Sequence, residues 1–186
     1  MPLFGRENIT SNNTTSNNVA MLGAFCLFLS AIEYMIPKPL PFLRIGLANL
    51  PVMLALDVLP FPSFLVLICI KITGQALITG TLFSYIFIFS AAGTFFSALL
   101  MYFLRRGLGS TAFGKKHLTF IGIGSAGAMI SNISQLALAY VFIFGENVYY
   151  ITPPFLAVGL LTGIILGFFC EKFSKKSQWR KKYANI

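Results

Sequence analysis

Six long runs of apolar residues determine what this sequence can fold into. Most of them approach the roughly 20 residues that a helix needs to cross the hydrocarbon core of a bilayer. Hydrophobic residues make up 56% of the chain and charged residues only 10%, so a soluble fold would have too little polar surface. We therefore predict an all-α integral membrane protein with six transmembrane helices. The runs cover about residues 19–36, 45–59, 63–82, 85–104, 119–143 and 153–170.

The two ends of the chain differ in composition from these runs. Residues 1–18 are rich in Asn, Ser and Thr, which predicts a flexible tail. Residues 19–172 form the predicted transmembrane domain, and residues 173–186 form a basic tail. Within the domain the second run is short and contains Pro51. We expect this helix to be tilted against its neighbours or partly unwound.

Basic residues outside the apolar runs indicate the orientation. Arg105, Arg106, Lys115 and Lys116 separate the fourth and fifth runs, and further Lys and Arg residues follow the sixth run. The positive-inside rule assigns both segments to the cytoplasm. With six crossings, both termini are cytoplasmic, and residues 37–44 and 145–152 face outside. The net charge of +9 therefore indicates topology in a cytoplasmic (inner) membrane, with the lipid bilayer as a partner, and not binding to nucleic acid.

The acidic residues are too few and too scattered for most enzyme chemistry. They are Glu7, Glu33, Asp57, Glu146 and Glu171. Magnesium-dependent prenyl or phosphoryl transfer needs clustered carboxylates. The single histidine and the isolated cysteines support neither a catalytic triad nor a zinc site. We expect no catalytic residues, no metal and no cofactor.

Two glycine patterns have a structural explanation. Gly122, Gly124 and Gly127 spell GxGxxG, but they lie in an apolar helix with no strand before them. Gly159, Gly163 and Gly167 recur at steps of four in the last helix. Small residues at such spacing allow helices to approach closely in membranes. Both patterns therefore predict helix packing and not a dinucleotide site.

Lys71 is the most unusual residue, because it lies near the middle of the third apolar run. A lone cation at that depth costs roughly 2.5–3.5 kcal/mol on insertion scales, so it needs a partner or a cavity. Gln75 and Thr79 follow at four-residue steps on the same helix face. A bound ligand with an anionic or carbonyl-rich end would explain this stripe. The structural alternatives are an ion pair with Glu33 or Asp57, or snorkelling to an interface.

Other polar residues are predicted to converge on the same cavity. The predicted substrate-binding set is Lys71, Gln75, Arg44, Asn49, Asn132 and Gln135. Interhelical hydrogen bonds would explain the amide side chains equally well. Ser90, Thr94 and Ser97 share a helix face, but membrane hydroxyls commonly bond to their own backbone, so this signal is faint. The many Phe and Tyr residues are expected to cover a flat apolar ring of the ligand.

Two strings carry a resemblance to a known family. Residues 41–50 read PFLRIGLANL, and residues 70–94 read IKITGQALITGTLFSYIFIFSAAGT. They resemble the Gx transporter family, which is labelled heptaprenyl diphosphate synthase component I, over about residues 19–172. That family is similar to the substrate-binding S components of energy-coupling factor (ECF) vitamin transporters. The resemblance implies a six-helix S-component-like bundle, a gating loop after the first helix and no ATPase of its own.

The resemblance also implies partners. In S components an AxxxA step on the first helix docks on a transmembrane coupling subunit, and Ala20 and Ala24 match that step. The leading hypothesis is thus a substrate-binding subunit that captures a small vitamin-like or quinone/isoprenoid precursor and works with a coupling subunit and ATPases. One alternative is a membrane anchor or accessory subunit of a flavin- or quinone-linked electron-transfer system. A noncatalytic partner of a prenyl synthase is another. A prenyl synthase itself would carry aspartate-rich motifs, which this chain lacks.

Overall fold

The computed structural model describes residues 4–36, 46–108 and 119–176, and all regular structure in these ranges is helical. Four stretches are long and apolar enough to cross a membrane: Thr14–Met35, Phe61–Thr79, Tyr85–Gly107 and Phe120–Ser174. Large apolar side chains are exposed along all four, as expected where lipid is the solvent. The chain is therefore an all-helical integral membrane protein.

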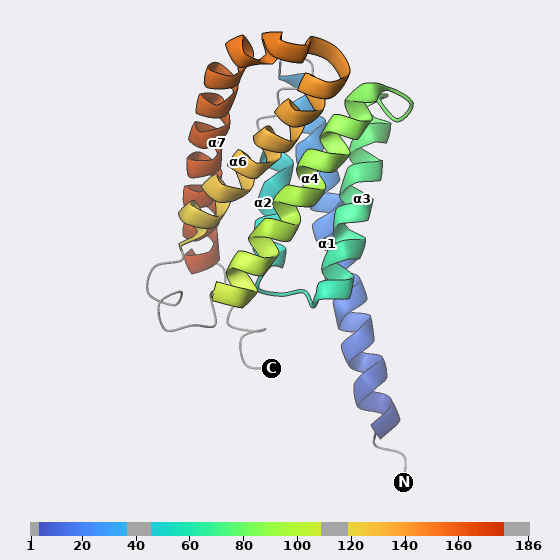
Figure 1. Ribbon diagram of the computed structural model, residues 1–186. Coiled ribbons are helices and arrows are strands. Elements are labelled where there is room, and N and C mark those ends of the chain that lie inside the picture. Colours follow the sequence, from blue (N-terminus) through green and yellow to red (C-terminus); the bar gives the residue numbers. More distant parts are fainter. Residues whose placement is uncertain (1–3, 37–45, 109–118, 177–186) are drawn as a thin grey trace.

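The helices run up and down in chain order (Figure 1). Helix α1 spans Phe4–Met35, α3 spans Phe61–Thr79 and α4 spans Tyr85–Phe103. A π-helical turn, Leu104–Leu108, continues α4. The candidate span Phe120–Ser174 is 55 residues long and contains α6 (Phe120–Ala139) and most of α7 (Val148–Lys176). The chain folds back between these two helices (Figure 1). Between them lie the π-helical η3, Tyr140–Phe144, and the 3-10 helix η4, Gly145–Asn147.

The second apolar run forms only a short helical segment. It consists of a 3-10 turn, η1 (Leu47–Asn49), followed directly by α2 (Leu50–Ala55). Together they extend about 14 Å, less than half of a ~30 Å hydrocarbon core. Pro51, Val52 and Met53 are buried, so this segment is enclosed by protein. Irregular backbone at membrane depth is tolerated under those conditions. The expectation of a partly unwound second helix agrees with this short segment.

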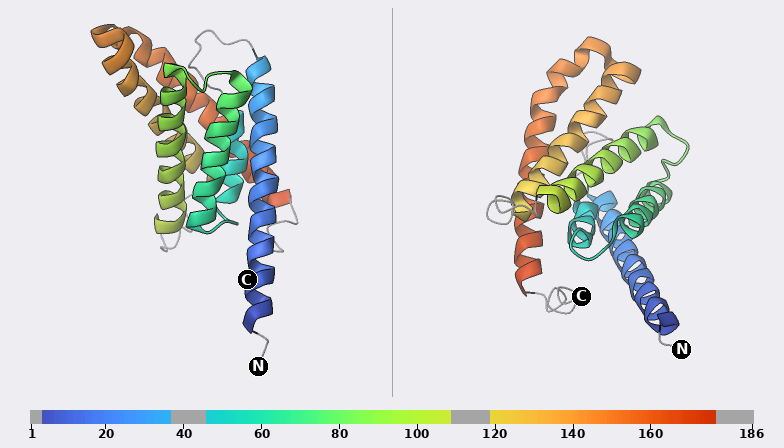
Figure 2. Two further views of the ribbon diagram at one scale, coloured as in Figure 1. Left: turned by 90° about the vertical axis from the view of Figure 1, so that its right-hand side faces the viewer. Right: turned by 60° about the horizontal axis from the view of Figure 1, so that its bottom comes forward.

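The N-terminal segment differs from the predicted flexible tail. The backbone of α1 is helical from Phe4, and this part extends beyond the rest of the bundle (Figure 2). The apolar span supplies a stable helical nucleus, and each residue added to an existing helix gains one backbone hydrogen bond. Residues 177–186, which include most of the predicted basic tail, lie outside the described residues.

The two ends of the bundle carry different side chains. Exposed tyrosines gather at one end, here called the tyrosine end: Tyr34, Tyr85, Tyr140, Tyr149 and Tyr150. Arg105, Arg106 and Lys172 lie at the other, here called the basic end. Tyrosine favours the membrane–water interface, where its ring is apolar and its hydroxyl is hydrated. These residues mark the two boundaries of the membrane-embedded region.

Glycines bring α6 and α7 into close contact, as the glycine patterns predict. A Cβ added at Gly163 would lie 2.9 Å from the Gly124 carbonyl oxygen and 2.8 Å from the Ala128 Cβ. A Cβ at Gly127 would lie 2.7 Å from the Met101 sulfur of α4. These residues are thus needed where three helices approach one another. The GxGxxG string is a packing surface in an α-helix.

Candidate functional site

A polar cavity lies inside the bundle. It is lined by residues of α1, η1, α2, α3, α4, α6 and α7, and it encloses about 620 Å³ of space between side chains, including the part open to the surroundings. Its lining is rich in hydrogen-bonding groups although it lies among membrane-crossing helices. The polar side chains that line it are Glu33, Asn49, Lys71, Gln75, Thr94, Ser97, Ser131, Asn132, Gln135 and Thr162.

Lys71 lies on the cavity wall at the middle of α3. It is 2% exposed, and its Nζ donates a hydrogen bond to Oδ1 of Asn49 at the end of η1. At 1.5 Å per residue, Lys71 is about 15 Å along the helix from Phe61 and about 12 Å from Thr79. At that distance from both ends its ammonium cannot snorkel to water. The short η1 and α2 segment therefore supplies an oxygen acceptor for a cation buried at membrane depth.

Glu33, predicted only as a possible ion-pair partner of Lys71, also lines the cavity. It is 1% exposed, and its Oε1 accepts a hydrogen bond of 3.1 Å from the backbone nitrogen of Gly46. Gly46 has a φ of 83°, a left-handed conformation that favours glycine. This contact ties the end of α1 to the start of η1. A pairing between Lys71 and Glu33 stays open, because both side chains line the same cavity.

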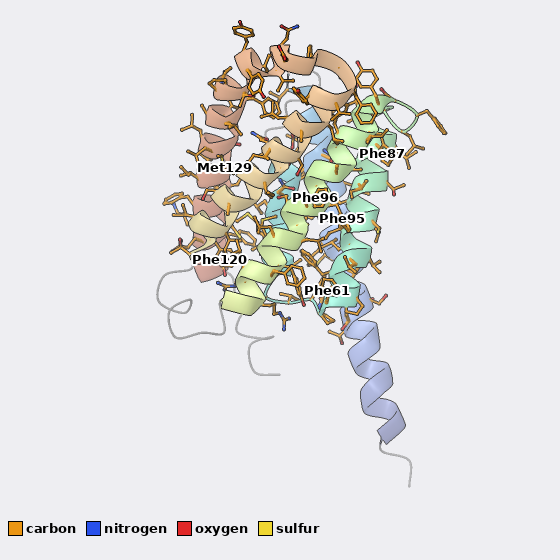
Figure 3. The ribbon with its side chains drawn as sticks, in the orientation of Figure 1. Phe61, Phe87, Phe95, Phe96, Phe120 and Met129 are labelled. Carbon is orange, nitrogen blue, oxygen red and sulfur yellow. The ribbon has the colours of Figure 1, made fainter. Side chains whose placement is uncertain are left out.

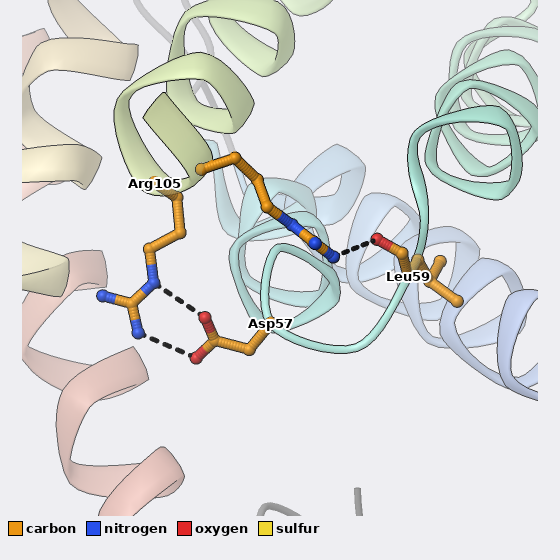
Figure 4. Close-up of polar contacts among 4 residues, drawn as sticks. Asp57, Leu59 and Arg105 are labelled. Carbon is orange, nitrogen blue, oxygen red and sulfur yellow. Dashed lines mark hydrogen bonds and ion pairs between the residues drawn. The ribbon is translucent and has the colours of Figure 1, made fainter. Parts of the chain in front are cut away.

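Asp57, the other suggested partner of Lys71, belongs to a different site. Arg105 Nε donates to Asp57 Oδ1 at 2.7 Å, and Arg105 Nη2 donates to Asp57 Oδ2 at 3.0 Å (Figure 4). Arg106 donates to the carbonyl oxygen of Leu59, at 3.3 Å. A carboxylate held by both oxygens at the basic end is not a partner for Lys71 at mid-depth. The Asp57 alternative was wrong because the end of α2 meets the end of α4.

The two amides of α6 differ in their contacts. Asn132 Nδ2 donates to the Phe155 carbonyl oxygen of α7 at 2.8 Å, which is the interhelical bond that the structural alternative expected. Gln135 Nε2 donates at 3.2 Å to Ser131 Oγ, one turn earlier on its own helix. Gly93 of α4 leaves space for Gln135, since a Cβ there would lie 2.6 Å from Gln135 Nε2. Both amides also line the cavity.

Several buried groups on the cavity wall make no hydrogen bond within the described part of the chain. The Ser97 hydroxyl, on a residue 1% exposed, has no partner there. The Gln75 amide and the Thr94 hydroxyl, on residues 5% and 8% exposed, also make no side-chain hydrogen bond there. Thr94 and Ser97 are not in the predicted binding set, because hydroxyls in membrane helices usually bond to their own helix. Their shared helix face is the faint signal that the sequence carries for this part of the cavity.

Aromatic residues are absent from the described lining of the cavity. The expectation that Phe and Tyr would cover a flat ring of the ligand is not met by these residues. Phe95 and Phe96 of α4, for example, are 40% and 52% exposed (Figure 3). Other aromatic side chains, such as Phe64 and Phe120, are buried in the apolar core and not at the cavity.

An apolar core lies against the part of the cavity that Met53 and Met101 line. This core contains residues of the α-helices α1, α2, α3, α4, α6 and α7, and it includes Phe64, Leu67 and Ile68 of α3, one to two turns before Lys71. Met53 and Met101 belong to the core and also line the cavity, so they form its floor. From there the cavity extends to Glu33 and Gly46, next to the tyrosine end.

Three predicted residues that the structure describes, Ala20, Ala24 and Thr79, are not among those that line the cavity. Arg44 lies outside the described residues. Ala20 and Ala24 are exposed on one face of α1, one turn apart. Thr79, the last residue of the predicted stripe, donates to the Gln75 carbonyl oxygen at 2.9 Å. Lys71, Gln75, Asn49, Asn132 and Gln135 do meet at one cavity. That they bind a ligand stays a prediction.

The described part of the chain contains no group of three His, Cys, Asp or Glu side chains that could hold a metal ion. Comparison with protein families finds a match to heptaprenyl diphosphate synthase component I over residues 22–173. That range is most of the chain and includes every described residue of the cavity. The chain belongs to the heptaprenyl diphosphate synthase component I family. No curated protein and no solved structure matches it.

Membership of the heptaprenyl diphosphate synthase component I family agrees with the resemblance found in the sequence. The match begins at Leu22 in α1 and ends at Phe173 in α7, so it covers the membrane-embedded helices and excludes both chain ends. In this member of the family, the structure adds a polar cavity around a buried lysine.

Proposed function

We propose that this protein is the substrate-binding membrane subunit, or S component, of an ECF-type importer. The observation that supports the proposal is the polar cavity around Lys71. Ionisable residues inside membrane proteins are costly and usually mark a substrate or ion pathway. A pocket with convergent polar groups is also the default form of a small-molecule site.

The shape of the cavity favours capture over conduction. Its floor of Met53 and Met101 belongs to the apolar core, which supports a binding site inside the bundle over a pore through it. In the proposed topology the chain crosses the membrane six times, with α2 as the shortened second crossing. Both termini and the basic end are cytoplasmic, so the ligand enters from outside at the tyrosine end.

Transport then requires other subunits. The sequence has no Walker motif, so in this proposal the energy comes from separate ATPases through a transmembrane coupling subunit. Ala20 and Ala24 are the proposed docking residues. Their exposure on one face of α1 leaves room for a partner helix to approach closely. In the same proposal the chain catalyses no reaction itself.

The test of binding compares Lys71→Met with Lys172→Met, an exposed lysine at the basic end. Each full-length protein is purified in mild detergent, and retained small molecules are measured by mass spectrometry. We expect Lys71→Met to retain at least tenfold less of a compound that the wild type and Lys172→Met both carry. Insertion should not suffer, because the cost of a buried charge is removed. Unchanged retention together with lower stability would make Lys71 a structural partner of Glu33.

The test of coupling replaces Ala20 and Ala24 together with Leu. The control is Ala157→Leu, an exposed alanine on α7. The double variant should lose copurification of a coupling subunit and its ATPases but keep its ligand, and the control should keep both. Equal copurification by all three proteins would remove the proposed interface. Copurified flavoprotein subunits in place of ATPases would favour the electron-transfer anchor.

A further inference from the structure

The charges that line the cavity restrict what it can hold. The described lining contains one basic side chain, Lys71, and one acidic side chain, Glu33, so its formal net charge is zero. Beside this pair, a ligand with a net charge would add an uncompensated ion to a cavity that lies among membrane-crossing helices. The desolvation of such an ion costs several kcal/mol. A ligand without net charge, including a zwitterion, avoids this cost.

Several hydrogen-bonding groups of the cavity make no side-chain hydrogen bond within the described part of the chain, and they indicate further properties of the ligand. The Gln75 amide comes from α3, and the Thr94 and Ser97 hydroxyls come from α4, all buried against the same cavity. The Gln135 carbonyl oxygen of α6 also accepts no hydrogen bond within the described part of the chain. A fully buried polar group without a partner, such as the Ser97 hydroxyl, costs about 1–3 kcal/mol. Such an array is favourable only if a polar molecule satisfies it.

The absence of aromatic residues from the described lining excludes one common mode of recognition. Flat conjugated rings are usually held by stacking on Phe, Tyr or Trp, and isoprenoid chains by an apolar channel. The wall formed by α7 instead presents Gly159, Gly163 and Thr162, and the floor presents two methionines. Neither arrangement provides a stacking surface.

We infer that the ligand is a compact, net-neutral, non-aromatic molecule rich in hydrogen-bonding groups, such as an amino-acid zwitterion, an amide or a polyol. This inference rests on the proposed substrate-binding function and narrows its substrate class. The ammonium of Lys71 and the Asn49 amide hold an oxygen of the ligand near η1. Gln75, Thr94, Ser97 and Gln135 bind its donors and acceptors between α3, α4 and α6.

The experiment identifies the retained compound by untargeted mass spectrometry in four full-length proteins. They are the wild type, Gln75→Leu, Ser97→Ala and the control Ser134→Ala. Ser134 is on α6 beside Gln135, but its hydroxyl bonds to the Ile130 carbonyl oxygen of its own helix at 2.8 Å. It does not line the cavity. Unfolding in detergent is measured in parallel, and neither cavity variant should be less stable, because each removes a group without a partner.

We expect a net-neutral, polar, non-aromatic compound in the wild type and in Ser134→Ala. Its retention should fall about two- to tenfold for each hydrogen bond lost in the cavity variants. A compound with the same dependence on Gln75 and Ser97 that is aromatic, isoprenoid or charged overturns this inference and leaves the proposed function standing. If no compound depends on the cavity residues, both fail.

Discussion

The contact between α6 and α7 allows a quantitative prediction at Gly167. A Cβ there would lie 2.5 Å from Ile121 Cα, 2.8 Å from the Phe120 carbonyl oxygen and 3.0 Å from the Ile121 nitrogen. All three atoms are backbone, so no side chain can turn away. Carbon atoms prefer separations of about 3.5–4.0 Å, so Gly167→Ala must push the two helices about 1 Å apart at this point.

The expected loss is about 1–3 kcal/mol, the usual cost of overpacking, offset by up to ~1 kcal/mol because Ala favours a helix over Gly. Gly122→Ala provides the matched control. Its Cβ would meet only Thr119 Oγ1, at 3.8 Å, so it keeps the helix gain without the clash. The propensity gain cancels between the two variants. Their free energies of unfolding should therefore differ by about 1–3 kcal/mol.

The assay uses the cysteines of the chain. Cys26 and Cys170 are 0% exposed, whereas Cys69 is exposed. In a Cys69→Ser background, a thiol-reactive dye therefore reports loss of structure while SDS is titrated into mild detergent. Gly167→Ala should expose the thiols at lower SDS than Gly122→Ala. Equal midpoints for the two variants would refute the claim that the glycines of α7 determine how closely it packs on α6.

Four further predictions follow from the contacts and from the sequence. In a double-mutant cycle of Asp57→Asn and Arg105→Gln, the coupling energy should be about 1 kcal/mol or less and should decrease as salt is added. The reason is that both side chains are partly exposed, at 23% and 19%. A coupling energy that salt leaves unchanged would contradict this. Asn132→Leu should lower stability by only about 0.6 kcal/mol, the average for interhelical hydrogen bonds in membranes, and a loss several times larger would show that the bond to Phe155 dominates the α6–α7 contact. In sealed cells and a Cys69→Ser background, an impermeant thiol reagent should label Leu40→Cys and Asn147→Cys but not Lys115→Cys, and labelling of the last would reverse the orientation. The purified chain should not elongate prenyl diphosphates with magnesium; elongation without a soluble partner would overturn the noncatalytic assignment.

The sequence predicts the long helices well because each is an almost continuous apolar run. The third run, at about 63–82, corresponds to α3 at Phe61–Thr79. Helix boundaries are less well predicted where polar residues interrupt a run without ending the helix. Helix α7 begins at Val148, before the predicted start at 153, because Tyr149, Tyr150 and Thr152 are compatible with a helix at a membrane interface.

The site is predictable to the extent that a polar residue in an apolar run is conspicuous. Lys71 and Gln75 meet that criterion, and they do line the cavity. Glu33 lies at the end of its run, and only the contact with Gly46 shows that it faces inward. Ser97 could not be assigned to the site from the sequence. A serine whose hydroxyl bonds to its own helix and a serine whose hydroxyl has no partner cannot be distinguished by sequence alone.

The short α2 segment has a consequence for how the protein is made. A helix enters the membrane from the translocon when it is long and apolar enough to partition into lipid by itself. At about 14 Å, η1 and α2 are too short for that, and their buried faces are already occupied by protein contacts. Its burial depends on α1, α3 and α7, which contact it, and α7 is the last of these helices to be synthesised. The cavity, which needs Asn49 opposite Lys71, is therefore among the last parts of the protein to mature.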